Sequence, residues 1–151
     1  MYYSYDNFKE DMKNVLDEIN SDGAAYDYVV GIVRGGSIPA ACISYHLGIP
    51  LKMVSWSTYH RDQMKESALD IAEDIMDGKK ILVVDDILDS GRTLTELMED
   101  WGVERNMFDL AVMVWNIGQE ILPDFYGRKI DRASNEEWIT FWWEDIYGKE
   151  V

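Results

Sequence analysis

The stretch 81–94 constrains the fold of this chain more than any other. Its first four residues, Ile-Leu-Val-Val, are apolar and mostly β-branched, which is typical of a strand buried on both faces of a parallel sheet. We expect this strand to end at two adjacent carboxylates, Asp85 and Asp86. Because the ligands of open α/β sheets bind beyond the carboxyl ends of the strands, both acids are expected at a ligand site.

A tight turn and a helix follow the two acids. Residues 89–93 have the sequence Asp-Ser-Gly-Arg-Thr, and apolar residues recur at helical spacing from Leu94 onward. Such a turn directs backbone N–H groups and the positive end of a helix dipole at one point, and the hydroxyls of Ser90 and Thr93 add donors. The stretch therefore predicts a phosphate site beside carboxylates suited to sugar hydroxyls or a metal ion.

Other protein classes also place an acidic pair after a buried strand. A P-loop NTPase needs the segment G-x-x-x-x-G-K-[ST], which the chain lacks. A receiver domain should open with the acidic strand, whereas 80 residues precede Ile81, and its next strand should end in Asp rather than Asn116. The remaining alternative is that the acids merely cap a strand before an ordinary turn.

A second strand, loop and helix unit precedes this one. The apolar run 28–33 leads into Arg34, Gly35 and Gly36, and Pro39 fits the first turn of a helix over 37–47. Two glycines after a strand allow the backbone to approach an anion closely. Glycine pairs also occur in strand-to-helix turns that bind nothing, so this stretch alone leaves both interpretations open.

The rest of the chain predicts ordinary elements. We expect a first helix capped by Asp6 or Asn7, with Asn7 and Glu10 as a capping box and an end at 21–23. Strands are expected over 51–55, 110–115 and 138–143, and helices over 68–76 and 93–102. The polar stretch 56–67 lacks a clear period and predicts a surface segment, for which a solvated loop is the simplest interpretation. Cys42 is expected to be a core residue of a helix, and His46 an unremarkable helical residue.

Composition limits the partners and the setting. The net charge of −15 argues against nucleic acid and anionic membrane surfaces, which would be repelled. A length of 151 residues suits one domain, 1–151. A single cysteine cannot form an internal disulfide, and neither a leader segment nor a membrane-spanning run is recognisable. We therefore expect a cytoplasmic protein that binds no nucleic acid and no membrane.

The motifs together resemble those of type I phosphoribosyltransferases. The run 83–94 is similar to the family signature that binds phosphoribosyl pyrophosphate (PRPP). The segment 33–40 resembles the pyrophosphate loop of the purine enzymes, and 57–63 resembles their flexible catalytic loop. This resemblance implies that the stretch 56–67 is a lid, in which Arg61 would be an extra cation. Trp138-Ile139, followed by Trp143-Glu144, resembles their purine-covering segment. The resemblance is greatest to xanthine-guanine and hypoxanthine-guanine phosphoribosyltransferases.

The resemblance implies an α/β fold and a reaction. The fold would be a central, mostly parallel sheet flanked by helices, with a small hood formed by the chain termini. The enzyme would transfer the 5-phosphoribosyl group from PRPP to guanine, xanthine or hypoxanthine, giving a nucleoside 5′-monophosphate and pyrophosphate, with Mg²⁺ as cofactor. The aromatic residues near the C-terminus predict a homo-oligomer, a dimer or a tetramer.

The resemblance also assigns roles to individual residues. Asp89 would accept a proton from the base, and Asp85 and Asp86 would hold the ribose hydroxyls and organise the metal ion, directly or through water. The 5′-phosphate would be bound by Asp89, Ser90, Gly91, Arg92 and Thr93. The pyrophosphate would be bound by Arg34, Gly35, Gly36, Thr58 and Tyr59. The purine would be bound by Asn116, Trp138 and Ile139. A cis peptide is implied between Arg34 and Gly35.

Asn116 departs from the family pattern. The purine enzymes carry a lysine here, which contacts the exocyclic oxygen of a 6-oxopurine, and no lysine lies between Lys80 and Lys129 to replace it. An amide also donates a hydrogen bond, but a charge-assisted bond is roughly twice as strong. Two alternatives therefore stay open: a non-catalytic PRPP-binding or nucleotide-binding regulator, and a phosphoribosyltransferase for another base.

Overall fold

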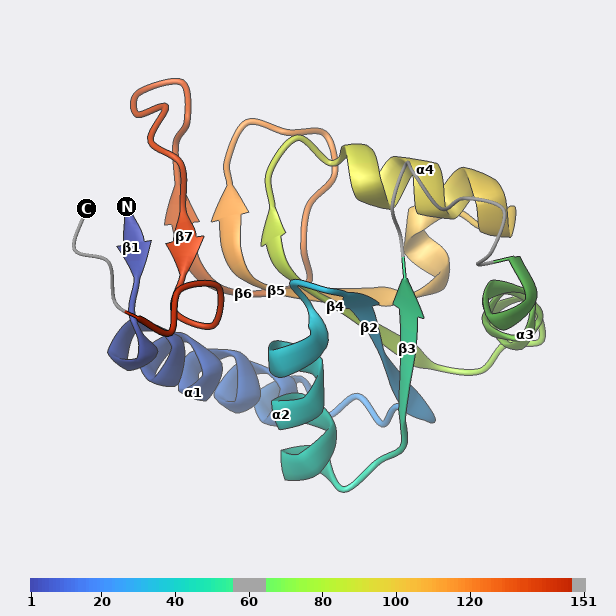
Figure 1. The fold of residues 1–151 in the computed structure, drawn as a ribbon. Helices are drawn as coiled ribbons and strands as arrows, with labels where there is room; N and C mark the ends of the chain where they lie inside the picture. Colours follow the sequence, from blue (N-terminus) through green and yellow to red (C-terminus); the bar gives the residue numbers. More distant parts are fainter. Residues whose placement is uncertain (56–64, 148–151) are drawn as a thin grey trace.

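A five-stranded parallel sheet forms the centre of the molecule (Figure 1). The computed structural model describes residues 1–55 and 65–147, and for 65–68 the backbone alone. The strand order is β3-β2-β4-β5-β6. The strands are β2 (Tyr28–Val33), β3 (Leu51–Ser55), β4 (Ile81–Leu88), β5 (Asp109–Asn116) and β6 (Phe125–Ile130). The predicted α/β class with a parallel sheet is confirmed.

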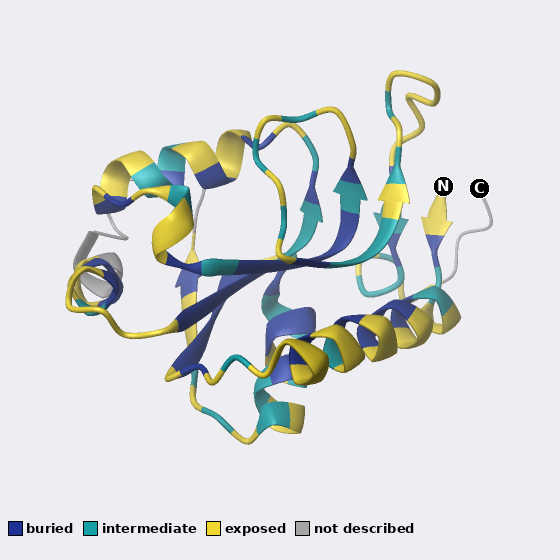
Figure 2. Cartoon of the chain, turned by 180° about the vertical axis from the view of Figure 1, so that it is seen from behind, coloured by how far each residue is buried: buried dark blue, intermediate teal, exposed yellow. Residues whose placement is uncertain are grey.

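Helices cover both faces of this sheet (Figure 1). On one face lie α1 (Tyr5–Asp22) and α2 (Ser37–Leu47), and on the other lie α3 (Lys65–Met76) and α4 (Arg92–Trp101). A short 3₁₀ helix, η2 (Arg105–Met107), precedes β5. The central strands β2, β4 and β5 are largely buried between the two helical layers, and the outward helix faces are exposed (Figure 2). No described helix combines the length and the apolar character that crossing a bilayer requires.

The predicted hood exists as a small second sheet. It consists of β1 (Tyr2–Tyr3) and β7 (Thr140–Phe141), which pair in parallel. The expected strand over 138–143 shrinks to two residues, because β1 offers only two residues to pair with it. Trp143 leaves the strand and stacks on Phe141 with a ring separation of 4.8 Å. The hood is therefore held largely by aromatic packing.

The first helix begins earlier than the sequence pattern predicts. Ser4 is its N-cap, and Asn7 completes the capping box: the Asn7 backbone N–H donates to Ser4 Oγ, and the Ser4 backbone N–H donates to Asn7 Oδ1, both at 3.1 Å. The prediction that Asp6 or Asn7 caps the helix was wrong. The reason is β1, whose pairing ends at Tyr3 and turns the chain directly into α1. The predicted end of the helix is confirmed, with Gly23 as a left-handed C-cap.

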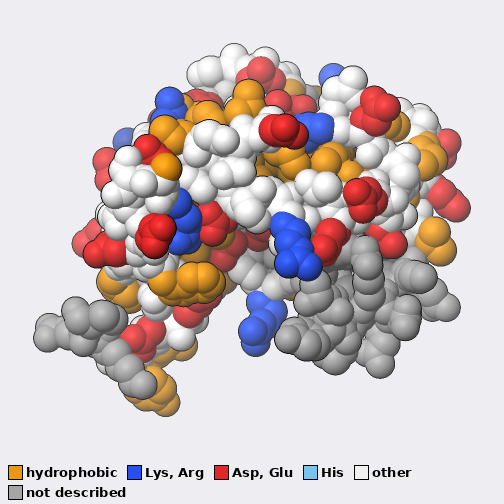
Figure 3. Space-filling model, turned by 90° about the horizontal axis from the view of Figure 1, so that it is seen from above, with side chains coloured by type: hydrophobic (Ala, Val, Ile, Leu, Met, Phe, Trp, Pro, Cys, Tyr) orange, Lys and Arg blue, Asp and Glu red, His pale blue; other side chains and the backbone are white. Residues whose placement is uncertain are grey.

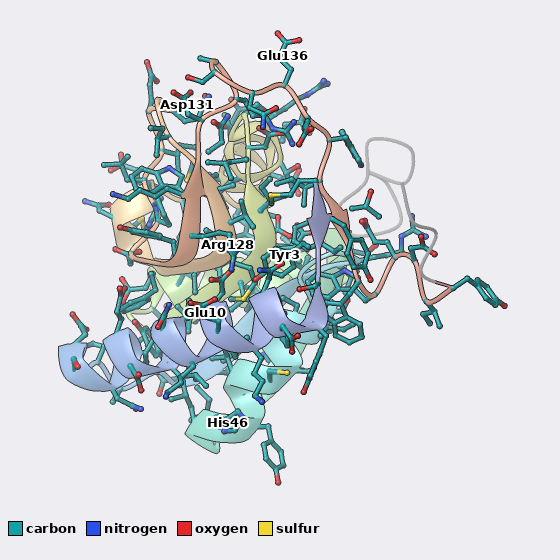
Figure 4. All side chains as sticks on the ribbon, turned by 90° about the vertical axis from the view of Figure 1, so that its left-hand side faces the viewer. Tyr3, Glu10, His46, Arg128, Asp131 and Glu136 are labelled. Carbon is teal, nitrogen blue, oxygen red and sulfur yellow. The ribbon has the colours of Figure 1, made fainter. Side chains whose placement is uncertain are left out.

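A buried ion pair ties the hood to the main sheet. The Asp11 side chain, on α1, is only 2% exposed and accepts hydrogen bonds from the Tyr3 hydroxyl at 2.7 Å and from Arg128 Nε at 2.6 Å. Arg128 lies on β6, and Figure 4 shows Tyr3 and Arg128 beside each other above α1, with Glu10 close by. Burial and the bond to Asp11 raise the pKa of Tyr3 above its usual range. We call Tyr3, Asp11 and Arg128 the hood clip.

Candidate active site

The two acids of the central motif lie in the second half of β4. The expectation that the strand ends at Asp85 and Asp86 was wrong, because β5 continues to pair with β4 as far as Leu88, opposite Trp115. The acids still lie toward the carboxyl end of the sheet, where they line a cavity of about 170 Å³ together with the turn 89–93. The alternative of a simple strand cap does not account for this cavity.

The environment of the two acids disfavours negative charge. Burial, and then the neighbouring charge of Asp86, raise the pKa of Asp85 well above its usual range. Burial also raises the pKa of Asp86, although the backbone N–H of Ile87 donates to Asp86 Oδ1 at 2.7 Å and opposes the shift. Two crowded carboxylates of this kind gain stability from a bound cation or from hydroxyl donors.

The glycine loop packs directly against this pair. A Cβ atom at Gly35 would overlap the Asp86 carboxylate, lying 2.5 Å from its Cγ. A Cβ at Gly36 would lie 2.5 Å from the carbonyl oxygen of Val84 and 2.7 Å from that of Ile32. Both positions therefore require glycine, and the loop after β2 and the acids of β4 border one site. The side chain of Arg34, at the start of this loop, is exposed.

The loop contains a cis peptide, but not at the expected bond. The bond between Val33 and Arg34 is cis, whereas the resemblance implied the bond between Arg34 and Gly35, so that prediction was wrong by one residue. The family motif identifies the loop from residue types, whereas the position of a cis bond depends on how the backbone turns. Thr58 and Tyr59, the other residues assigned to pyrophosphate, lie outside the described residues, as does most of the expected lid.

The turn after β4 has the geometry of an anion-binding loop. Gly91 is the N-cap of α4 and has φ of +79°, a left-handed conformation that favours glycine. Ser90 and Thr93 are exposed and keep their hydroxyls near the helix N-terminus. Arg92 behaves differently, because its side chain is 75% exposed and forms an ion pair of 3.1 Å with Glu96, one turn further along α4.

Asp89 stands at the centre of a polar cluster. Its Oδ1 accepts a hydrogen bond from Asn116 Nδ2 at 3.1 Å and lies 2.8 Å from Arg132 Nε. Asn116, at the end of β5, is 5% exposed, and its Oδ1 accepts from the Arg132 backbone N–H at 3.1 Å. The strands β4 and β5 and the loop after β6 thus meet at one carboxylate.

Arg132 is the residue that sequence reasoning missed. The available signal was its position just after a parallel strand, at the edge where Asp89 and Asn116 lie. That signal could not be used, because the charged and glycine-containing segment 125–130 did not predict a strand. The polar residues of this segment are explained by its edge position, because among the described strands β6 pairs with β5 alone.

The two residues assigned to the purine have different environments. Trp138 is 76% exposed, which excludes the core role that its aromatic character also allowed, and its ring centre lies 5.9 Å from Arg132 Cζ. Ile139 is buried in the core beneath the hood. Its neighbouring backbone is engaged by the N-terminus, because the Met1 amino group donates to the Trp138 carbonyl at 2.7 Å.

Oxygen donors of the acidic pair suit Mg²⁺ better than a softer metal ion. Among the described residues, no group of three or more His, Cys, Asp or Glu side chains could hold a metal ion by itself. Mg²⁺ is commonly bound through one or two carboxylates plus substrate phosphates, and Asp85 and Asp86 match that pattern. Acidic and basic side chains lie close together on the face at the carboxyl ends of the strands (Figure 3).

An acidic pair on a parallel strand, an adjoining anion loop and a packed glycine loop define the class of a phosphoribosyl-binding enzyme. The phosphoribosyl transferase domain model matches residues 1–144, so the chain belongs to the phosphoribosyltransferase family. The resemblance drawn from the sequence is thereby confirmed. Family membership also gives the reaction class, transfer of a phosphoribosyl group.

Individual relatives cover most of the chain. The xanthine-guanine phosphoribosyltransferase of Cereibacter sphaeroides is 31% identical over 150 residues, 95% of this chain and 86% of that protein. Among solved structures, the purine phosphoribosyltransferase of Pyrococcus horikoshii has a TM-score of 0.71 at 24% identity, covering 95% of this chain and 93% of the other. A hypothetical protein from Neisseria gonorrhoeae with bound ppGpp has a TM-score of 0.70 at 26% identity, covering 95% and 88%.

Proposed function

We propose that this enzyme transfers the 5-phosphoribosyl group from PRPP to a 6-oxopurine, namely guanine, xanthine or hypoxanthine. The products are a nucleoside 5′-monophosphate and pyrophosphate. One observation carries the proposal: the acidic pair lines a cavity together with the turn 89–93, and the glycine loop packs on the same pair through the contact of Gly35 with Asp86. A phosphorylated sugar with a second phosphate group is the kind of ligand that these three parts fit together.

Each part of PRPP has a matching group in the site. The turn from Asp89 to Thr93 binds the 5′-phosphate through backbone N–H groups at the start of α4. The loop 34–36 binds the pyrophosphate, with the exposed guanidinium of Arg34 as its cation. Asp85 and Asp86 accept hydrogen bonds from the ribose hydroxyls, which relieves the crowding of two carboxylates.

Asp85 and Asp86 would also hold Mg²⁺, directly or through water. When bound, the ion neutralises charge on the departing pyrophosphate. The protein's own residues clamp the sugar while the bond between C1′ and the pyrophosphate oxygen breaks and the bond from C1′ to N9 of the base forms. The proton on N7 of the base must then leave.

Asp89 is the residue we propose to accept that proton. Among the described residues its Oδ1 is engaged by Asn116 and Arg132, whereas no hydrogen bond to its Oδ2 is found. A carboxylate with one oxygen fixed and the other open is oriented to take a proton from a ligand. Trp138, exposed and with its ring centre 5.9 Å from Arg132 Cζ, would stack on the purine.

The names of the relatives agree with a purine substrate. Xanthine-guanine phosphoribosyltransferases of Cereibacter sphaeroides and Idiomarina loihiensis are 31% and 30% identical to this chain. The test is to incubate the protein with PRPP and Mg²⁺ and with each of hypoxanthine, guanine, xanthine and adenine. We expect pyrophosphate release with at least one 6-oxopurine. No release with any of the four bases would refute the purine assignment.

A second candidate is a non-catalytic nucleotide-binding regulator of the same fold. The neutral Asn116 favours it, and the similar Neisseria gonorrhoeae protein is known with bound ppGpp. Calorimetry separates the two candidates, because a regulator binds PRPP or a nucleotide without turnover. A cytoplasmic location and a dimeric or tetrameric state remain predictions, and sedimentation of the purified protein tests the second.

A further inference from the structure

The side chain of Arg132 lies beside Asp89, the proposed proton acceptor, although Arg132 belongs to none of the family motifs. Arg132 follows β6, and its Nε lies 2.8 Å from Oδ1 of Asp89, which belongs to the turn after β4. The Arg132 side chain is largely buried, at 20% exposure. A buried guanidinium at this distance contributes a full positive charge to the base side of the site.

Several contacts hold Arg132 in this position. Its backbone N–H donates to Asn116 Oδ1 at 3.1 Å, and its Nη1 donates to the Glu137 carbonyl at 3.1 Å. Asp131 orders the same loop by accepting bonds from the Ala133 N–H at 3.0 Å and the Ser134 hydroxyl at 2.9 Å. Figure 4 shows this loop, with Asp131 and Glu136 labelled, standing above the end of the sheet. The guanidinium is therefore preorganised.

Donors of this guanidinium remain available to a ligand. Arginine has five N–H groups, and only Nη1 makes a well-directed hydrogen bond within the described residues. Nε is close to the Asp89 carboxylate, but its N–H is not aimed along a hydrogen bond and is buried without an acceptor. Nη2 makes no hydrogen bond within the described residues, so an oxygen atom placed beside this end of the guanidinium would gain a charge-assisted hydrogen bond.

We propose that Arg132 is a specificity-determining residue, whose guanidinium donates to the oxygen at C6 of the purine while Asp89 accepts the proton of N7. The inference rests on the proposed function. N7 and the C6 substituent are neighbours on one edge of a purine, and the site presents an acceptor and a donor side by side. Adenine carries an amino group at C6, so a donor would face a donor.

Asn116 then has a different role from the family lysine. Its amide nitrogen is used by Asp89 and its amide oxygen by the backbone of Arg132. We assign it as a positioning residue that joins the acid to the cation, while Arg132 supplies the charge that an amide lacks. The family lysine is thus replaced by two residues that contact each other: Asn116, which holds the loop, and Arg132, which carries the positive charge.

The experiment compares nucleotide binding and turnover in Arg132→Gln, Arg132→Lys and the control Lys129→Gln. Lys129 lies on β6 over the rings of Trp115 and Tyr126, so the control removes the same charge without touching Asp89. Calorimetry measures the affinities for GMP, IMP and AMP, and steady-state kinetics measure the KM values for hypoxanthine and PRPP. In Arg132→Gln we expect GMP and IMP binding to weaken about tenfold to a hundredfold. AMP and PRPP should change less than about twofold, Arg132→Lys should be intermediate, and the control should match the wild type.

Two results would overturn the inference. One is an unchanged preference for GMP and IMP over AMP in Arg132→Gln, and the other is equal weakening of all three nucleotides and PRPP, which would make Arg132 a purely structural tie. If Arg132→Gln does not fold, Arg132→Lys decides: an unchanged preference for GMP and IMP over AMP, together with unchanged affinities for these nucleotides, would refute the inference. Nucleotide binding needs no turnover, so failure of the wild type to release pyrophosphate would refute the proposed function alone. A wild type that binds no purine nucleotide would refute both.

Discussion

Removing the carboxylate of the hood clip, by Asp11→Ala, should destabilise the protein strongly. Asp11 is buried on α1 and accepts bonds from the Tyr3 hydroxyl, from Arg128 Nε and, at 3.2 Å, from Arg128 Nη2. These contacts join β1, α1 and β6. The nearest other acid is Glu10, whose exposed carboxylate lies 3.8 Å from Arg128 and cannot replace the lost partner.

The size of the effect follows from the burial of the two charges. Breaking a buried ion pair by removing one partner typically destabilises by about 3–5 kcal/mol. Arg128 is 27% exposed and retains some hydration, so we expect the lower end, about 3 kcal/mol. For a chain of this length, about 3 kcal/mol corresponds to a fall in Tm of roughly 6–12 °C.

Thermal and urea unfolding of matched variants measure this prediction. Asp17→Ala, an exposed acid on the same helix, is the control and should stay within about 0.5 kcal/mol of the wild type. Asp11→Ala combined with Arg128→Met should recover part of the loss, because no charge is then left unpaired. A loss below about 1 kcal/mol in Asp11→Ala, or no recovery in the double variant, would refute the reasoning.

The remaining predictions concern the site and the response to pH. Asp89→Asn should lower kcat by about 10²–10⁴-fold while PRPP affinity changes little, because the proton acceptor is lost and the phosphate loop is kept. Gly35→Ala should weaken PRPP binding sharply, since the added Cβ overlaps Asp86. Trp138→Ala should raise the KM for the base with PRPP affinity unchanged. Burial and a bond to a carboxylate raise the pKa of Tyr26, so its contribution to stability is complete below pH 10 and is lost as pH rises above it.

Each of these predictions has its own control. The control for Gly35→Ala is Gly23→Ala, which introduces a strained left-handed alanine into open space. It should lower Tm without altering PRPP affinity. A PRPP affinity in Gly35→Ala equal to that of Gly23→Ala would contradict the prediction. Equal losses of kcat and PRPP affinity in Asp89→Asn would make that residue structural, and unchanged base affinity in Trp138→Ala would remove the stacking role. Tyr26→Phe should flatten the fall in Tm above pH 10, and a profile identical to the wild type would contradict the assignment.

The sequence by itself determined the parallel sheet and two of its ligand loops. These parts are recognisable because neighbouring residues determine them. A β-branched run predicts the strand 81–84 and places the acids after it, and a glycine followed by a helical pattern predicts the turn around Gly91. Gly35 and Gly36 belong to the same group, although only the structure gave the steric reason, their contact with the carboxylate of Asp86 and with β4.

Only the tertiary structure decided how the edge of the sheet and the hood are built. The strand β6 tolerates charged residues because, within the described part of the chain, it pairs with β5 alone. Its Arg128 pairs with Asp11, and the following Arg132 lies beside Asp89, both acids far away in the sequence. β1 is too short for a sequence pattern to predict it, and the strand expected over 138–143 is reduced to β7, the two residues that pair with β1. Pairings between distant segments leave no local period, so the place of Arg132 beside Asp89 and Asn116 could not be inferred before the chain was folded.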